Sequence, residues 1–179
     1  LVRETKRMTQ LPAFKGYIQD VGRPSPNFRH VACARRPKHG ACRNRHCIGS
    51  ETCPNLDTSH DDYVKLLREI RSVKGVKKVF VRSGLRYDYV LADHNKAFVK
   101  ELCQYHVSGQ LKVAPEHVVK HVTDLMGKAD VQAFLKFKDW FDEANRELGK
   151  KQYLVPYFMS SHPGCTLKDA VALAEFLRD

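Results

Sequence analysis

Apolar and polar positions follow two different periods along this chain, and the two periods alternate. A helical spacing occupies the segments 61–73, 95–106, 131–149 and 166–179. The longest of these has an apolar face made of Val131, Phe134, Phe137, Phe141, Ala144 and Leu148. Gly75 follows the first helix, Gly149 ends the third, and Thr166 is a suitable N-cap for the last. The pattern therefore predicts four helices after residue 60.

Short apolar runs lie between these helices and are typical of buried strands. They cover 15–21, 77–82, 110–114 and 153–159. Gly84 closes the second run, and we expect Pro115 to end the third. Strands that alternate with helices form a parallel sheet covered by those helices. The sequence thus predicts a single α/β domain over 1–179, with about four βα units.

A long irregular insertion, 22–60, separates the first strand from its helix, and loops of this length are usually functional or disordered. In parallel α/β folds the carboxyl ends of the strands face the active site. Candidate site residues therefore follow each strand directly. These groups are Gly22–Arg23–Pro24, Arg82–Ser83–Gly84, Pro115–Glu116–His117 and His162–Pro163–Gly164.

The positive charge is concentrated at the start of the chain. The net charge is +11, with 11 Lys+Arg against 4 Asp+Glu in residues 1–60, and 20 against 16 in 61–179. Such an excess suits an anionic partner, although a solvated basic loop has the same composition. One hypothesis is a metal-stapled basic module in which Arg29 through His46 grip the phosphates of a nucleic acid. No aromatic platform or helix-turn-helix pattern accompanies the basic segment, which disfavours this alternative.

Four cysteines lie close together in the insertion, namely Cys33, Cys42, Cys47 and Cys53. Three interpretations stay open for them. A tetrathiolate site for zinc or an auxiliary iron–sulfur cluster fits their number, and the surrounding cations favour an anionic site. Free or redox-active thiols are the second interpretation, and disulfides are the third. The spacing differs from the paired spacing of a zinc ribbon.

Several protein classes do not fit this sequence. No run of about eighteen apolar residues occurs, so a membrane span is not expected. The first residues carry charges where a signal peptide would be apolar. Six cysteines without such a signal favour a reducing compartment, and we expect a cytoplasmic location.

Several of these motifs, in the same order, resemble the YgiQ-type radical S-adenosylmethionine (radical SAM) proteins. They are "FKGYIQDVGRPSPNFR", the spaced cysteines, "KKVFVRSGLRYDYVLAD", "LKVAPEHVVKHVTDLMGK" and "YLVPYFMSSHPGCTLKDAVALAEFL". The likeness runs from about Leu11 to the last residue. It implies a partial TIM-like (βα)6 barrel that holds a [4Fe–4S] cluster and S-adenosylmethionine. Proteins of this kind cleave the cofactor to a 5′-deoxyadenosyl radical with an electron from a donor, and the substrate is unknown.

The chain departs from this family in one essential motif. The catalytic cluster is bound by Cys-x-x-x-Cys-x-x-Cys, and that spacing is absent here. The resemblance therefore implies an internal fragment with strands two to five of six, in which residues 1–14 end a preceding helix. Three thiolates hold the cluster's iron, so we expect the chain alone to be inactive.

The resemblance also implies which residues contact the cofactor. Gly22 and Pro24 match a Gly-Gly-Pro motif after the second strand, while Arg23 replaces its second glycine. The remaining implied contacts are Arg82, Ser83, Lys112 and His162. Catalytic residues stay unknown.

Each of these assignments has a structural alternative. Lys112 points into the barrel in one register and toward a helix or solvent in the other. His162 precedes Pro163-Gly164, which can form a simple turn. Glu116 and His117 suit acid–base chemistry or the start of a helix, and Arg86 suits a carboxylate grip or a surface pair with Asp88. Buried packing is expected for Cys103, Phe137, Trp140 and Phe141, and Cys165 has little functional weight.

Overall fold

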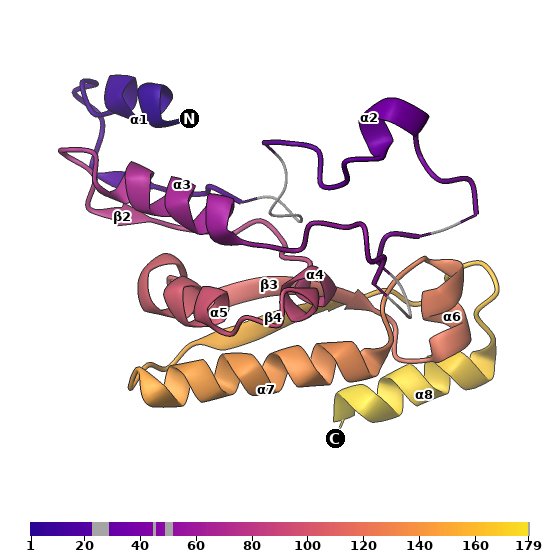
Figure 1. The fold of residues 1–179 in the computed structure, drawn as a ribbon. Helices are drawn as coiled ribbons and strands as arrows, with labels where there is room; N and C mark the ends of the chain where they lie inside the picture. Colours follow the sequence, from indigo (N-terminus) through magenta and orange to yellow (C-terminus); the bar gives the residue numbers. More distant parts are fainter. Residues whose placement is uncertain (23–28, 45, 49–51, 179) are drawn as a thin grey trace.

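The computed structural model describes residues 1–22, 29–44, 46–48 and 52–178 (Figure 1). The strands are β1 (Tyr17–Ile18), β2 (Lys78–Val79), β3 (Gln110–Glu116) and β4 (Tyr153–Phe158). The longer helices are α3 (Asp61–Arg71), α7 (Val131–Glu147) and α8 (Leu167–Arg178). The shorter ones are α1 (Val2–Met8), α2 (Arg36–His39), α4 (Tyr87–Ala92), α5 (Ala97–Glu101), the π-helix η1 (Leu102–His106) and α6 (Lys120–Leu125).

The strands form two parallel pairs, β1 with β2 and β3 with β4. A single parallel bridge between Leu85 and Val113 connects the chain after β2 to β3. Neighbouring strands therefore follow one another in the order of the sequence. All four predicted strands are present, although β1 and β2 are much shorter than the apolar runs that predicted them. The partial barrel stays a prediction, because the described strands belong to two separate sheets.

The strand β3 corrects one expectation, since it does not end at Pro115. It continues to Glu116, and its pairing with β4 changes register between Val113 and Glu116. Proline lacks a backbone N–H and is tolerated in a strand at such a bulge. The strand therefore passes through Pro115.

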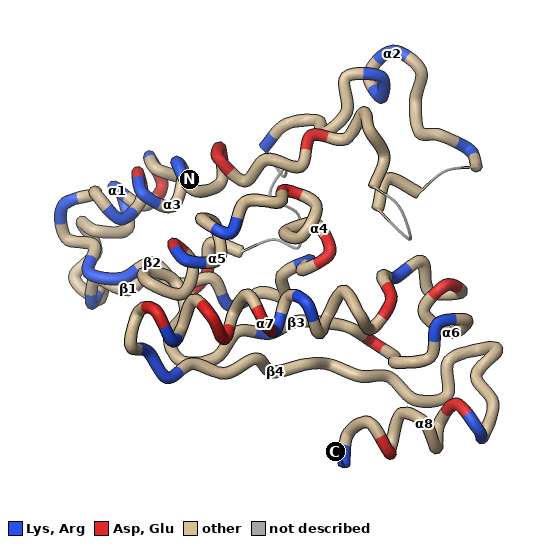
Figure 2. Tube along the Cα trace, turned by 60° about the horizontal axis from the view of Figure 1, so that its bottom comes forward, with Lys and Arg blue, Asp and Glu red and all other residues tan. Residues whose placement is uncertain are grey.

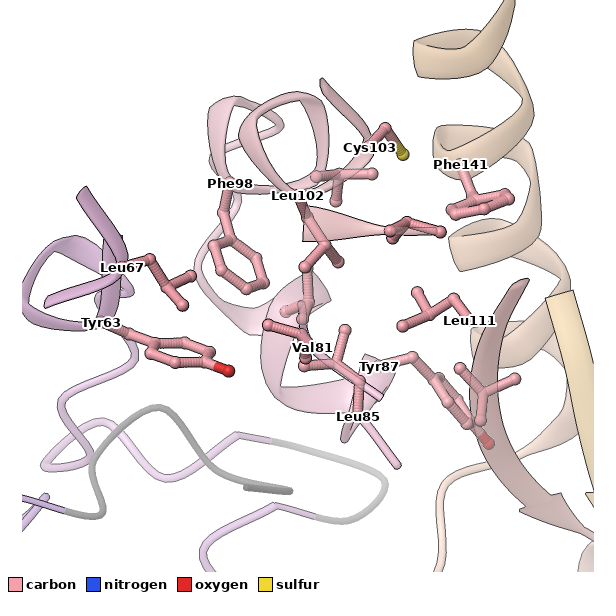
Figure 3. Close-up of a cluster of buried hydrophobic side chains, with 14 of the residues drawn as sticks. Tyr63, Leu67, Val81, Leu85, Tyr87, Phe98, Leu102, Cys103, Leu111 and Phe141 are labelled. Carbon is pink, nitrogen blue, oxygen red and sulfur yellow. The ribbon is translucent and has the colours of Figure 1, made fainter. Parts of the chain in front are cut away.

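One face of the strands is covered by helices. Along β3, Leu111 and Val113 are buried while Lys112 between them is exposed. Figure 3 shows the covered side, where side chains from the helices meet side chains from the strands and the segments that follow them. They include Tyr63, Leu67, Val81, Phe98, Leu102, Leu111 and Phe141, which belong to one core cluster. Because side chains alternate along a strand, Lys112 lies on the opposite, uncovered face.

The helix α7 is a major contributor to this core. Phe134, Phe137, Phe141 and Ala144 are buried along it, as the helical spacing predicted. Its N-cap Asp130 accepts a hydrogen bond from the backbone of Gln132. Trp140 is only partly buried and packs at the edge of the core. Cys103 is fully buried, and burial raises the pKa of its thiol to about 12, so it is a core residue.

A fully buried histidine joins η1 to β2. Nδ1 of His106 lies 2.8 Å from the carbonyl oxygen of Val79, and Nε2 is buried without a hydrogen-bond partner among the described residues. Burial lowers the pKa of His106 below its ordinary value of 6.5, although Glu101 opposes this effect. The imidazole is therefore neutral in the folded protein near neutral pH.

The neutral state of His106 makes stability depend on pH. The unfolded chain binds this proton near pH 6.5, and the folded chain binds it only at lower pH. Below that value the unfolded state takes up more protons, so the free energy of unfolding falls as the pH is lowered. Urea denaturation at about pH 7.5 and about pH 5.5 measures this loss. His106→Leu should flatten the pH dependence and exposed His39→Leu should not; equal slopes in all three proteins would contradict the assignment.

The outer strands are open on one side. Within the described residues, β1 pairs only with β2 and β4 only with β3. Exposed apolar side chains occur along β4 and just beyond it, namely Tyr153, Val155, Tyr157 and Met159. An unpaired apolar edge is a template for association.

We expect the isolated chain to associate through this edge. Val155→Lys should reduce association, because a lysine on an edge strand disfavours pairing with a second chain. Leu177→Lys changes an exposed apolar residue of α8 and is the matched control. Sedimentation velocity over a concentration series measures the effect, and a wild-type chain that stays monomeric throughout would refute it.

Candidate functional site

The ends of β1 and β2 are held together by one carboxylate. The backbone N–H groups of Lys78 and Phe80 donate to the carbonyl oxygens of Gly16 and Ile18, as in a regular parallel ladder. At the next step, the backbone N–H of Arg82 donates to Oδ1 of Asp20, 2.8 Å away. The ladder therefore ends at Arg82, where the acceptor is the side chain of Asp20 and not a backbone carbonyl oxygen.

Asp20 binds a second residue of the β2 end as well. Its Oδ2 accepts hydrogen bonds from the backbone N–H and the hydroxyl of Ser83. Partial burial raises the pKa of Asp20, but the hydrogen bonds from Arg82, Ser83 and Gly22 outweigh it, so the pKa lies below the ordinary value. The carboxylate is thus ionised at neutral pH.

Gly22 follows this contact and has no room for a side chain. A Cβ atom there would lie 2.6 Å from Oδ1 of Asp20 and 2.9 Å from Cβ of Ser83. The preceding residue is also fixed, because the hydroxyl of Tyr63 in α3 donates to the carbonyl oxygen of Val21 at 2.6 Å. Contacts with Ser83, which follows β2, and with Tyr63 of α3 therefore fix the position of the backbone around Gly22.

Two hollows adjoin these strand ends. A cleft of about 770 Å³ between α1 and β1 is lined by residues that include Glu4, Asp20, Gly22 and Arg29. Its volume falls in the range of about 300–1,000 Å³ that small-molecule sites occupy. A smaller pocket of about 190 Å³ is lined by Arg82, Ser108, Gly109, Gln110 and Lys112.

The structure thus brings several predicted cofactor residues together. Gly22 lies against Ser83, and Arg82 shares a pocket with Lys112. Lys112 is exposed and does not face the helices that cover the core, so the barrel-facing and the solvated interpretations both stay open. Pro24 lies outside the described residues.

A second polar group lies at the ends of β3 and β4. Glu116 has a φ of 70°, a conformation that non-glycine residues rarely adopt. Its Oε1 is 3.2 Å from Nζ of Lys128, and its Oε2 is buried without a hydrogen-bond partner among the described residues. His117 is fully buried, and its Nδ1 accepts a hydrogen bond from the backbone of Val119. Glu116 therefore ends the strand and does not begin a helix.

His162 and Cys165 belong to this second group. Sγ of Cys165 lies 3.8 Å from Nε2 of His117, and Nδ1 of His162 lies 2.8 Å from the carbonyl oxygen of Pro163. Burial lowers the pKa of His117; Asp169 opposes this effect, while His162 reinforces it. The turn expected around Pro163-Gly164 is present, since the backbone N–H of Cys165 donates to the carbonyl oxygen of His162.

The remaining expectations at the strand ends have clear outcomes. Thr166 and Asp169 exchange hydrogen bonds in a capping box at the start of α8, which confirms the predicted N-cap. The guanidinium of Arg86 donates two hydrogen bonds to the Asp88 carboxylate, so the local pair is the observed arrangement.

Asp20 is a site residue that the sequence patterns did not indicate. Its only signal is an acidic residue directly after a short apolar strand.

The cysteine segment forms a projecting arm, which we call the basic arm and define as residues 29–44 and 46–48. Cys33 is partly buried, Cys42 and Cys47 are exposed, and Cys53, just beyond the arm, is buried. The backbone N–H of Cys53 donates to the carbonyl oxygen of Cys47, 2.9 Å away. In the part of the chain that the structure describes, no three His, Cys, Asp or Glu side chains are grouped to hold a metal ion. The tetrathiolate site stays a prediction.

The chain is similar, over all or nearly all of its length, to part of several longer proteins. It is 50% identical over 179 residues to a UPF0313 protein of Clostridium perfringens (strain SM101 / Type A), covering 100% of this chain and 27% of the relative. A UPF0313 protein of Clostridium botulinum (strain Okra / Type B1) is 49% identical over 178 residues, covering 99% of this chain and 28% of the relative. A UPF0313 protein of Methanocella arvoryzae is 49% identical over 179 residues, covering 100% of this chain and 30% of the relative.

Two other comparisons give no match. No family model matches the chain, and no solved structure matches it. The chain spans less than a third of the length of the curated relatives reported above. Among the described helices, none has the length and apolar character needed to cross a membrane.

Metal analysis separates the metal-site interpretation of the cysteines from the other two. If the four thiols form one site, anaerobically purified chain should carry zinc or iron, and Cys42→Ser should lose most of it because three ligands bind more weakly than four. Cys103→Ala removes a buried core thiol and is the control. Inductively coupled plasma mass spectrometry gives the metal content. Equal metal content in wild type and Cys42→Ser would contradict a tetrathiolate site.

Proposed function

We propose that this chain is the cofactor-facing section of a radical SAM protein, in which the ends of β1 and β2, with Lys112 of β3, bind S-adenosylmethionine. The observation that carries the proposal is the packing of Gly22 against Asp20 and Ser83. Gly22 is half-buried, and a glycine lets a ligand approach its backbone closely because no side chain stands between them. Backbone of this kind suits the amino acid part of the cofactor.

The charges around Gly22 fit the two ends of that amino acid part. Asp20 is exposed and ionised, which suits an ammonium group. Arg82 and Lys112 line one pocket from neighbouring strands, and such cations suit a carboxylate. Nζ of Lys112 has no ion pair with another described residue.

The order of the strands supports a partial barrel around this site. Neighbouring parallel strands that follow the sequence, with helices on one face, are the arrangement of a (βα) barrel wall. The uncovered face bears Lys112 and, opposite it in the pairing, Val155. In the proposed barrel this face lines the interior.

The residues of this chain do not fit the catalytic cluster itself. A [4Fe–4S] cluster in this class needs three thiolates with a spacing that the chain lacks. We propose that these thiolates come from other parts of a longer protein, in agreement with relatives more than three times as long. Under this proposal the chain alone binds the cofactor but produces no radical.

Binding of S-adenosylmethionine to the chain tests this proposal directly. Saturation-transfer NMR should detect weak binding, and Arg82→Ala or Lys112→Ala should weaken it by roughly tenfold, as expected for loss of a hydrogen bond to a charged group. Lys78→Ala is the matched control, because Lys78 is an exposed cation on β2 four residues before Arg82.

Two outcomes would overturn the proposal. One is the absence of binding to the wild-type chain at millimolar cofactor. The other is an equal loss of affinity in all three variants, which would indicate a general effect of net charge. Activity of the isolated chain toward S-adenosylmethionine would contradict the inference that cluster ligands lie elsewhere.

A further inference from the structure

The outer part of the basic arm is exposed without interruption. Every residue from 34 to 44 is exposed, including the single helical turn α2. Figure 1 shows α2 standing away from the sheets and from the other helices. At Gly40, no atom beyond the glycine and its two chain neighbours lies within 4 Å of the position where a Cβ would be, in agreement with this exposure.

The base of the arm is fixed to the body of the domain. The backbone N–H of Asp57 donates to the carbonyl oxygen of Ala32 at 2.7 Å, and the hydroxyl of Tyr89 in α4 donates to the carbonyl oxygen of Asp57 at 2.9 Å. His60, which is 2% exposed, lies with Nδ1 2.9 Å from Asp93. The arm therefore projects from a packed base, and its outer part stays in solvent.

Positive charge dominates the arm, and only at its base is a cation paired with another described residue, where Nε of Arg29 lies 3.5 Å from Oδ2 of Asp62. Residues 29–48 include six Lys+Arg and no Asp or Glu. Figure 2 shows the cations of α2 at the outer end of the arm. The cations of its exposed outer part are Arg35, Arg36, Lys38 and Arg43, and none of them has an ion pair with another described residue.

Some cations elsewhere in the chain are paired with acidic side chains of the chain itself. Lys96 and Lys100 bind Glu143 and Glu147, and Arg68 binds Glu101. Cations that repel one another at the tip of the arm reduce the stability of the free protein. Their natural partner is a dense array of negative charge outside this chain.

The chemistry of the tip favours phosphates over an acidic protein surface. Protein interfaces depend on buried aromatic or large apolar anchors, and residues 34–44 contain none. Arginine, which supplies three of the four exposed cations, binds phosphate oxygens in a bidentate geometry. Single-stranded nucleic acids are bound largely by stacking on aromatic side chains, which the tip also lacks.

We propose that the basic arm binds the phosphate backbone of a double-helical nucleic acid. A narrow, convex, cationic projection on a fixed base can contact phosphates on a duplex without reading base edges. The interaction has little dependence on base sequence and a strong dependence on salt. It is independent of the proposed cofactor site.

Fluorescence anisotropy with a labelled RNA hairpin and a DNA duplex tests this proposal. The triple variant Arg35→Ala/Arg36→Ala/Lys38→Ala should lose about tenfold or more in affinity and reduce the slope of log affinity against log salt by roughly 2–3. The control is Lys65→Ala/Lys74→Ala/Lys151→Ala, which removes three exposed cations outside the arm and leaves the same net charge. Circular dichroism confirms that both variants are folded.

The competing outcomes separate the alternatives. Equal losses in the two triple variants would show nonspecific attraction to net charge and would overturn the proposal. Competition by polyglutamate as strong as that by duplex, at equal charge concentration, would assign the arm to an acidic protein partner. Tighter binding to a single strand than to either duplex would also refute it. Each result is obtained without S-adenosylmethionine, so it is separate from the test of the cofactor site.

Discussion

The carboxylate of Asp20 determines how the first two strands end. Hydrogen bonds between β1 and β2 alternate regularly until the backbone of Arg82 meets the Asp20 side chain where a carbonyl oxygen would otherwise stand. The same carboxylate binds Ser83, which brings that residue against Gly22. A main-chain ladder would have continued the sheet, whereas a side-chain acceptor stops it and leaves the following backbone accessible. The candidate cofactor site depends on the Asp20 carboxylate accepting this hydrogen bond in place of a backbone carbonyl oxygen.

Much of the fold follows from hydrophobic periodicity, because burial of one face is a local property of each segment. The faces of α3 and α7 and the positions of all four strands were predictable in this way. The end of β3 was not, since Pro115 normally disfavours a strand and only the bulge opposite β4 accommodates it. The parallel barrel, the cysteine site and the role of Pro24 remain predictions.

The site was harder to predict than the fold, because its contacts join residues far apart in sequence. Asp20 and Arg82 are separated by 62 positions, and no local pattern links them. The strand containing Lys112 was visible, but which way Lys112 faces depends on register, and register depends on the partner strand. The charge of the basic arm was evident from composition. Its uninterrupted exposure and its packed base became evident only in three dimensions.

Glu116 has a consequence for how this protein tolerates sequence change. A left-handed backbone at a residue with a side chain costs about 1–2 kcal/mol, and here the side chain also leaves one buried oxygen without a partner among the described residues. Glycine at this position would relieve both costs. Glycine would also remove the ion pair with Lys128, so retention of glutamate in a search for thermostable variants would mean that the carboxylate contributes more, through this pair or another role, than the strained backbone costs.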